Sequence, residues 1–394
     1  MILPGAFIDG RPATLGVLGG GQLGRMFVHA AQAMGYETVV LDPDPASPAG
    51  RVSQHFIQAD YRDPQALRAL AAQAHAVTTE FENVPAESLA QLAAVLPVAP
   101  AADAVAIAQD RIHEKAHFAR CAAASGVAPA PHAVIEREAD LATVPDALLP
   151  GILKTARLGY DGKGQASADT RAGLAEAWRH LGRAACVLEQ RLPLAAECSV
   201  VVARGRDGQM VTLPPQRNLH RGGILAVTEV NEQNMSPTLA QSAMKATKNI
   251  VQELRYVGVL CVEYFVLHDG SLVVNEMAPR PHNSGHWSID ACEVSQFELQ
   301  VRALAGLPLS EPRQHGAAVM LNLLGELWLD AAGVPRTPPW AEVLALPGAH
   351  LHLYGKQQAR RGRKMGHLTL VAEDAAAARQ QALRAAMLLG IEAW

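Results

Sequence analysis

Apolar and polar residues alternate with two different periods along the first hundred residues. A stretch over 22–34 has helical spacing and ends at Gly35. Short apolar or β-branched runs around it predict strands over 14–18, 38–41, 76–81 and 95–98. Strands that alternate with helices are typical of βαβ units and therefore indicate a parallel sheet.

The pattern changes after about residue 104, where a helix is predicted to run to Gly126 before the segment Val127–Pro131 ends it. Strands are expected over 151–155 and 186–190, on either side of a glycine-rich loop. Strands then dominate from Cys198 to Val274, together with a helix over 237–254. Beyond residue 306, strands at 318–323 and 349–354 and a helix at 375–389 form a last unit.

A chain of 394 residues is too long for one ordinary core, so two or three domains are expected. We expect an α/β protein with α+β elements. Its N-terminal parallel-sheet domain covers 1–106, its central domain 107–306 and its small C-terminal domain 307–394. The central domain includes a small lid subdomain at about 130–195.

Charged and hydrogen-bonding side chains are most concentrated in residues 272–287, LVVNEMAPRPHNSGHW. A short strand over Leu272–Asn275 is predicted to deliver Asn275 and Glu276 to its end, which is where open α/β sheets place ligands. The neighbouring apolar strand Val259–Val266 contains one acid, Glu263. Lone acids in such strands are costly unless they are paired or bound to a metal, so a Mg²⁺ site is favoured over two solvent-facing acids.

The glycine turn at residues 19–24, GGGQLG, has two readings. It follows a strand, opens a helix and precedes Asp42 by about twenty residues, which is the dinucleotide-binding pattern. Glycine turns at strand–helix junctions also serve other phosphates or tight packing. We favour a substrate-facing or structural turn, and nicotinamide binding stays open as the alternative.

A second glycine-rich loop, GYDGKGQ at 159–165, follows Lys154. Its backbone amides and its lysine could approach a polyphosphate, whereas the alternative is a solvated hairpin tip. After the next strand, the edge at 189–192 could hydrogen-bond adenine, and Glu197 could take ribose hydroxyls.

The C-terminal unit contains two further candidate features. His350 and His352 lie on one face of a predicted strand, where packing and hydrogen bonding are favoured over a metal role. A basic run with interspersed glycines follows over 356–364. A compact monophosphate site is favoured there over a nucleic-acid patch or a solvated face.

Composition excludes several classes of protein. Hydrophobic residues make up 49% of the chain, charged residues 18%, and the net charge is −4, which favours a soluble globular protein with no nucleic-acid or membrane partner. The five cysteines form no CxxC pair, so a reducing cytosol fits. No run of about 18 apolar residues occurs, and the first residues lack a signal-peptide pattern. We expect a cytoplasmic protein.

In order along nearly the whole chain, the motifs GGGQLGRM (19–26), FENVP (81–85), YDGKGQ (160–165), NLH (218–220), NEMAPRPHNSGHW (275–287), SQFE (295–298) and GRKMGH (362–367) are present. This ordered set resembles the ATP-grasp superfamily and, within it, the N5-carboxyaminoimidazole ribonucleotide synthetases. The resemblance implies an ATP-grasp fold with a Rossmann-like pre-ATP-grasp domain. It also implies a homodimer.

The resemblance further implies a ligand for each motif. The residues expected to bind ATP are Arg111, Lys154, Gly159, Tyr160, Asp161, Gly162, Lys163, Gly164, Gln165, Glu189, Gln190, Arg191, Leu192, Glu197, His220, Asn275 and Glu276. Glu263 and Glu276 would ligate Mg²⁺, for which two ions are expected. Contacts to 5-aminoimidazole ribonucleotide are expected from Gly21, Gln22, Leu23, Glu82, Arg280, His282, Asn283 and Ser284, with Lys356, Arg363 and Lys364 holding its 5′-phosphate.

The implied reaction starts with bicarbonate attacking the γ-phosphate of ATP to give carboxyphosphate, with Lys154 and Arg280 holding oxygens. Carboxyphosphate, or CO₂ released from it, then carboxylates the exocyclic amine while the 159–165 loop excludes water. Two departures from the family pattern leave the shape of the phosphate loop and the second metal's ligands open. Arg361 stands where proline is expected, and Ala278 where some ATP-grasp enzymes have a polar ligand. The alternatives are another ATP-grasp ligase, such as a formate-using glycinamide ribonucleotide transformylase, and an NAD-dependent dehydrogenase.

Overall fold

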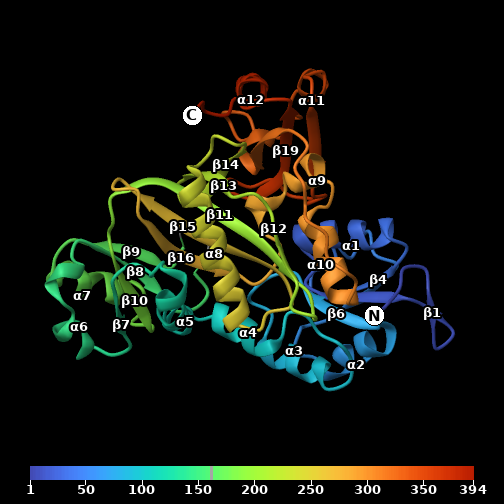
Figure 1. The fold of residues 1–394 in the computed structure, drawn as a ribbon, viewed down its shortest axis with the longest axis horizontal. Coiled ribbons are helices and arrows are strands. Elements are labelled where there is room, and N and C mark those ends of the chain that lie inside the picture. Colours follow the sequence, from blue (N-terminus) through green and yellow to red (C-terminus); the bar gives the residue numbers. More distant parts are fainter. Residues whose placement is uncertain (160–162) are drawn as a thin grey trace.

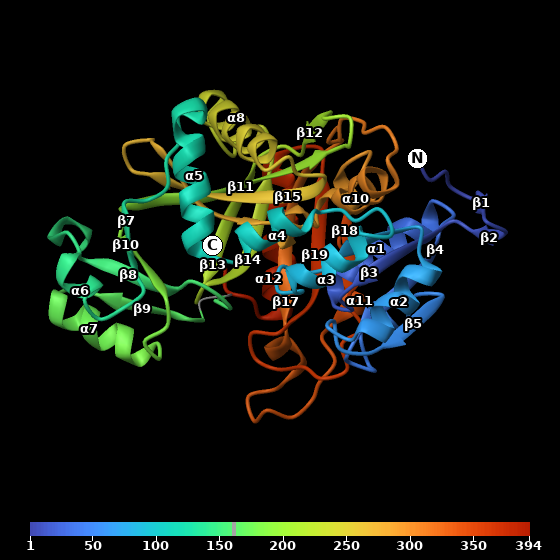
Figure 2. The same cartoon turned by 90° about the horizontal axis from the view of Figure 1, so that it is seen from below.

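The computed structural model describes residues 1–159 and 163–394. The chain forms three lobes around a central sheet, with the N-terminal domain, a small green subdomain and the C-terminal unit at separate corners (Figure 1). Seen from below, the small subdomain and the N-terminal domain lie at opposite ends of the molecule (Figure 2).

The N-terminal domain is built on a parallel sheet, as the alternating pattern predicts. Its strands lie in the order β5 (His55–Gln58), β4 (Glu37–Asp42), β3 (Thr14–Leu18) and β6 (Ala76–Thr79). Its helices are α1 (Gln22–Ala33), α2 (Pro64–Gln73), α3 (Ala86–Ala93) and α4 (Ala102–Ala108), and a short hairpin of β1 (Phe7–Ile8) and β2 (Arg11–Pro12) precedes them. The predicted strand over 95–98 is wrong, because Val98 forms only an isolated bridge with Val77.

The long helix predicted from 104 to 126 is in fact two helices. The first is α4, and the second, α5 (Arg111–Ser125), begins after Asp110. The side chain of Asp110 accepts a hydrogen bond from the Ile112 amide at 3.0 Å and so caps a new helix there. Gly126, at φ +77°, ends α5 where the sequence predicts.

The small subdomain is a four-stranded antiparallel sheet. Its strands lie in the order β7 (His132–Ile135), β10 (Cys186–Gln190), β8 (Gly151–Thr155) and β9 (Gln165–Ala168). Leu174 and Trp178 of α7 (Arg171–His180) pack against this sheet. Short helices α6 (Asp140–Thr143) and η1 (Asp146–Leu148) complete the subdomain.

One nine-stranded antiparallel sheet carries both the central region and the C-terminal unit. Its strands are, in spatial order, β16 (Leu272–Ala278), β15 (Gly258–Leu267), β11 (Leu194–Arg204), β13 (Gln216–Arg221), β14 (Ile224–Val230), β17 (Ala317–Leu324), β19 (Lys364–Ala372) and β18 (Ala349–Leu353), and β12 (Met210–Thr212) pairs with β11. The pairing of β14 with β17, for example Thr228 with Met320, joins the two regions. The predicted boundary at 306 therefore falls in a connection between strands of one sheet.

Alternation along β11 and β15 decides which helix covers each face of this sheet. Val200 and Val262 face a core shared with α5 and α8 (Pro237–Glu253). Val201 and Cys261 face the opposite core, which contains α9 (Ser288–Ala291) and α10 (Gln296–Ala305). The C-terminal strands are covered by α12 (Ala375–Leu389), whose bounds the sequence predicts, together with α11 (Trp340–Leu344) and η3 (Gly325–Trp328). Among the described residues, none of the helices is both long and apolar enough to span a bilayer.

Candidate functional site

The two acids predicted to ligate Mg²⁺ stand opposite each other on neighbouring strands. Glu263 of β15 pairs in register with Glu276 of β16, and a bulge follows Glu263. Glu276 is inside the strand, because β16 continues to Ala278 rather than ending at Asn275. The prediction that Glu276 follows a strand end is therefore wrong, although the proximity of the two acids is as expected.

Cations surround the Glu276 carboxylate. Arg111, the first residue of α5, donates to it at 2.9 Å. Although burial raises the pKa of Glu276, the charges of Arg111 and Lys154 outweigh it and lower the pKa to about 2. Glu276 is therefore ionised at neutral pH, which is the state that a metal ligand or an ion-pair partner requires.

Two buried lysines, Lys115 and Lys154, contact Glu189 beneath this site, and the sequence analysis missed Lys115. Lys115 of α5 lies 3.2 Å from Glu189 and donates to the Asn275 carbonyl at 2.6 Å. Lys154 of β8 donates to the other Glu189 oxygen at 3.0 Å and approaches the Asn275 side chain at 3.4 Å. Burial raises the pKa of Glu189, but Lys115 and Lys154 outweigh it, and the net pKa is lowered.

The sequence contains a signal for this missed group. Glu114 and Lys115 stand three and four positions after Arg111, and Phe118 continues the same helical face into the core. A face that starts with charges and ends in apolar residues indicates buried ions, which need partners. Glu114 accepts from the Met277 amide at 2.7 Å, and burial raises its pKa to about 7.

On the other side, Glu263 meets two histidines. His282 lies 3.1 Å from Glu263, and His220 lies 3.9 Å from Glu263 and 2.7 Å from Glu197. Burial lowers the pKa of His282, but Cys261 and Glu263 outweigh it and raise the pKa to about 10. Ser284 connects His282, at 2.8 Å, to a buried chain of polar side chains through Ser199, also at 2.8 Å.

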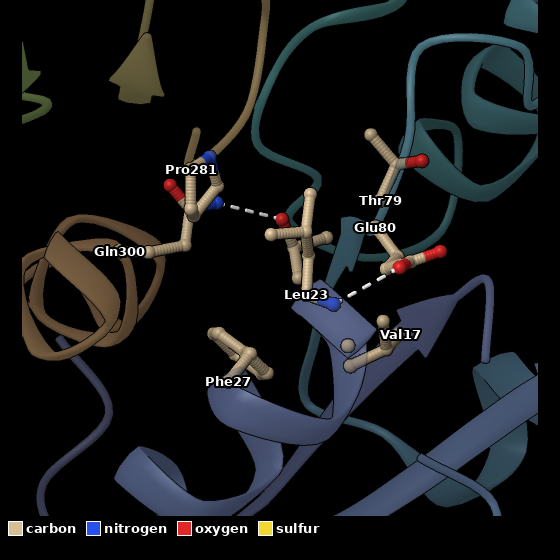
Figure 3. Close-up of a pocket in the computed structure, with 9 residues that line it drawn as sticks. Val17, Leu23, Phe27, Thr79, Glu80, Pro281 and Gln300 are labelled. Atoms are coloured by element: carbon tan, nitrogen blue, oxygen red, sulfur yellow. Dashed lines mark hydrogen bonds between the residues drawn. The ribbon is translucent and has the colours of Figure 1, made fainter. Parts of the chain in front are cut away.

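Arg280 links this region to the N-terminal domain. Its guanidinium pairs with Glu82, and although burial raises the pKa of Glu82, Arg280 outweighs it and the net pKa is lowered. Nearby, the Leu23 amide at the start of α1 donates to Glu80 at 3.1 Å (Figure 3). The gap that Leu23 and Glu80 line with Pro281 has a volume of about 10 Å³, near the lower limit for one water molecule. It is a packing gap rather than a ligand site.

The predicted adenine-binding edge is partly used by the protein itself. The Gln190 amide donates to Pro131 at 2.9 Å and the Arg191 amide to Pro150 at 3.0 Å. Leu192, the last residue of the predicted edge, follows these two. Within the part of the chain that the structure describes, no such bond occupies the Leu192 amide.

The glycine-rich segment connects β8 and β9, which pair with each other. Tyr160, Asp161 and Gly162 lie outside the described residues. Of the others, Gly164 accepts from the Thr155 amide at 2.8 Å, and Gly159 lies close to the Arg111 guanidinium. The described part of the loop therefore starts beside the cations that surround Glu276.

The predicted phosphate-binding residues lie at one end of the β18–β19 hairpin. Lys364 begins β19, and its carbonyl accepts from the Lys356 ammonium at 2.7 Å. Arg363 donates to the Gln358 carbonyl at 2.9 Å, and Glu326 accepts from the Gly362 amide at 2.9 Å. The loop is thus held in a defined shape by side-chain bonds to its backbone, one of them from Glu326 outside the loop.

Family models match three parts of the chain. A ribonucleotide synthetase preATP-grasp domain matches residues 13–109, an ATP-grasp domain 120–297, and a phosphoribosylaminoimidazole carboxylase C-terminal domain 318–381. A relative from Brucella melitensis biotype 1, described as N5-carboxyaminoimidazole ribonucleotide synthase, is 43% identical over 363 residues, which cover 91% of this chain and 96% of the relative. The chain belongs to the N5-carboxyaminoimidazole ribonucleotide synthase family.

Solved members of this synthase family have the same fold. The synthetase from Thermus thermophilus is 38% identical, with a TM-score of 0.86 over 96% of this chain and 99% of that one. The Aspergillus clavatus synthase, solved in complex with ADP and 5-aminoimidazole ribonucleotide, is 29% identical with a TM-score of 0.85 over 96% and 99%. The family and the ATP-grasp fold predicted from the motifs are therefore confirmed.

Because the chain belongs to this synthase family, the alternative of an NAD-dependent dehydrogenase is wrong. The structure of the 19–24 turn gives the physical reason. Asp42, the acid expected to bind a ribose hydroxyl, accepts hydrogen bonds from the Gly20 amide at 2.6 Å and from Tyr61 at 2.6 Å. Glu80 packs against Gly21 and takes the Leu23 amide, where a dinucleotide phosphate would have to lie. The Asp42 and Glu80 side chains thus occupy the amides of Gly20 and Leu23, which a dinucleotide phosphate would need.

A cluster of histidines lies between the C-terminal strands and α9. His352 bonds both oxygens of Asp290, at 2.9 and 3.0 Å, and stacks on His367 with 4.6 Å between ring centroids and 13° between planes. The Nδ1 atom of His367 is bonded to Tyr354 at 2.9 Å. Ligand atoms of Asp290, His352 and His367 lie within 4.8 Å of one another, but nitrogens in parallel stacked rings do not converge on one ion. This arrangement favours the packing role predicted for His352.

Proposed function

We propose that this chain carboxylates the exocyclic amine of 5-aminoimidazole ribonucleotide with ATP and bicarbonate, as a ligase of purine biosynthesis. The observation that carries the proposal is the in-register pairing of Glu263 with Glu276 beside Arg111, in a chain that belongs to the synthase family. The ATP-grasp match and the relative solved with ADP and the ribonucleotide support both substrates.

ATP would bind between the small subdomain and the central sheet. Lys154 pairs with Glu189 and Arg111 with Glu276, which supports a site that offers two cations to the phosphates of ATP. Glu197 and the 189–192 edge would hold ribose and adenine, with the Leu192 amide as a donor to the base. The other residues that the resemblance implies as ATP contacts stay predicted contacts of this site.

The donor set fits Mg²⁺. Glu263 and Glu276 offer carboxylate oxygens from adjacent strands, and Glu276 is ionised because Arg111 and Lys154 hold its pKa low. Bound Mg²⁺ would neutralise charge on the transferring phosphoryl group. The cations that pair with the two acids would then turn toward the substrate oxygens.

The chain's own residues would position the reactants rather than react covalently, as phosphoryl transfer requires. Lys154 would hold an oxygen of the transferring group. Arg280, which Glu82 orients, would hold the carboxylate formed from bicarbonate. His282 and Ser284 would face the ribonucleotide, together with Asn283 of the same short helix η2 (Asn283–Gly285). Exclusion of water by the 159–165 loop stays a prediction.

The test is to measure ADP release with and without bicarbonate and the ribonucleotide. The proposal requires both for rapid release and a carboxylated product in equal amount. Release that depends on formate in place of bicarbonate would instead indicate another ATP-grasp ligase. ATP hydrolysis that neither co-substrate stimulates would reject the assignment.

The homodimer and the cytoplasmic location stay predictions. The resemblance implies the dimer, and sedimentation of the purified chain tests it. The five cysteines, which are free and buried, are consistent with a reducing compartment.

A further inference from the structure

Two arginines of the N-terminal domain reach the predicted phosphate loop: Arg25, which stands in the motif at 19–26 but was given no role there, and Arg51, which lies outside the motifs. Arg51 donates to the Gly355 carbonyl at 3.3 Å. The Arg25 guanidinium lies against Gly355 so closely that a Cβ atom there would be 3.3 Å from its Nη1. Gly355 directly precedes Lys356, the first residue of the basic loop. Arg25 and Arg51 therefore extend the positive charge of this loop across the domain junction.

The charge of these arginines is not neutralised by protein acids. Across residues 1–159 and 163–394, neither Arg25 nor Arg51 forms an ion pair with a carboxylate. The Arg25 side chain donates to the Pro48 carbonyl at 3.1 Å instead. Burial and the neighbouring Arg51 both lower the pKa of Arg25. Two neighbouring guanidinium groups without a carboxylate partner attract an anion to the space beside them.

The nearby acid does not supply that counter-ion. Asp290, on α9, is bonded to His352 at 2.9 Å and lies 3.7 Å from His350. On α1, His29 is one turn beyond Arg25, and burial together with Arg25 lowers the pKa of His29. Next to the two arginines, the described residues named here therefore provide no free acid, which suits an anionic ligand.

The position of Arg25 on α1 connects the two ends of the substrate site. Gly21 and Arg25 are four residues apart, about 6 Å along the helix axis and on the same face. Gly21 contacts Glu80, whose charge interacts with Arg280, where the carboxyl group would be transferred. The face of α1 thus runs from the reacting centre to the basic loop.

We propose that Arg25 and Arg51 bind the 5′-phosphate of the ribonucleotide together with the basic loop. This inference rests on the proposed function, since it names a second group of contacts to the same substrate. The ribonucleotide would then connect the N-terminal domain to the C-terminal unit through its phosphate, and guanidinium groups would donate charge-assisted hydrogen bonds to it.

The test compares steady-state kinetics of Arg25→Ala and Arg51→Ala with wild type. We expect the KM for the ribonucleotide to rise about tenfold or more in each variant, as the loss of one charge-assisted hydrogen bond predicts, while the KM for ATP barely changes. Ribose 5-phosphate, used as a competitive inhibitor, should lose affinity by a similar factor. Arg25→Lys should recover part of the loss because it retains the charge.

Arg68→Ala is the matched control, because Arg68 is an exposed arginine on α2 of the same domain. It should leave both KM values unchanged. The aminoimidazole nucleoside without its phosphate should be an equally poor substrate for wild type and for Arg25→Ala. A further loss with the nucleoside, or a rise in both KM values with a lower Tm, would show that Arg25 only packs the domains together and would overturn the proposal.

The outcome is separable from that of the proposed function. If wild type does not consume the ribonucleotide at all, the proposed function fails. If wild type turns over normally and both alanine variants keep the wild-type KM, the function stands and this inference is wrong.

Discussion

Replacing Lys115 by methionine tests whether the buried ions beneath the site hold the central domain together. The Lys115 side chain is 1% exposed and its partner Glu189 is 4% exposed, so neither charge can turn to water. Methionine keeps most of the volume of the lysine stem and removes its charge. Glu189 then retains one partner, Lys154, at 3.0 Å.

The expected cost follows from these contacts. Breaking a buried ion pair by removing one partner costs about 3–5 kcal/mol, and the remaining Lys154 contact places this case near about 3 kcal/mol. For a domain of this size that corresponds to a decrease in Tm of roughly 6–12 °C. The penalty should shrink as the pH falls below about 4, because the lowered pKa of Glu189 contributes stability only while Glu189 is ionised.

The assay is thermal unfolding of wild type, Lys115→Met, Glu189→Gln and the double variant. The double variant should be more stable than the sum of the single losses predicts, by at least about 1 kcal/mol, since neither Lys115 nor Glu189 is then left buried without the other. Lys245→Met, on the exposed face of α8, is the control and should change stability by less than about 0.5 kcal/mol. A Lys115→Met variant that unfolds at the wild-type temperature would refute this reasoning.

Three further outcomes are expected. Glu276→Gln should lower kcat for ADP formation by several orders of magnitude while the fold is retained, and near wild-type turnover at saturating Mg²⁺ would contradict a metal role. The Gly164→Ala variant should release ADP in excess over carboxylated product. Alanine is strained at the φ of +69° found there, and its Cβ atom would lie 2.5 Å from Thr155 Oγ1. Equal yields of ADP and product would mean that this loop has no role in coupling the two steps. His282→Gln should lower the free energy of unfolding, and the loss should be largest below about pH 6.5. The difference from wild type should disappear as the pH rises through the folded-state pKa of about 10, which denaturant titrations at several pH values can measure.

Local periodicity predicted many elements because their signals lie within a few residues of one another. The strand Gly151–Thr155 and the helix over 375–389 have the predicted bounds. The break at Asp110 was missed, because a capping side chain interrupts a pattern that otherwise looks helical throughout. Strand β16 was predicted too short, because Glu276 ends the apolar run while its pairing with Glu263 continues the strand. Pairing partners are distant in sequence, so no local pattern contains them.

The same limit applies to the site. Motifs brought attention to Lys154 and Glu276 because each stands beside glycines or other polar residues in a short segment. Lys115 lies inside a helix, and its role depends on Glu189 from a strand of the small subdomain. Arg25 stands in the motif at 19–26, but its contact with Gly355 exists only in the folded chain. Such residues require the tertiary structure.

The continuous nine-stranded sheet has a mechanical consequence. Because β14 and β17 are hydrogen-bonded neighbours, the acids on β15 and β16 and the basic loop beside β19 belong to one stiff frame. Hinge motion between them would break strand pairing, so the distance from Glu263 and Glu276 to Lys364 is set when the chain folds. A ligand that must reach both ends of this sheet would therefore have to match that fixed distance. Movement on ligand binding would have to come from the separate four-stranded sheet or the N-terminal domain.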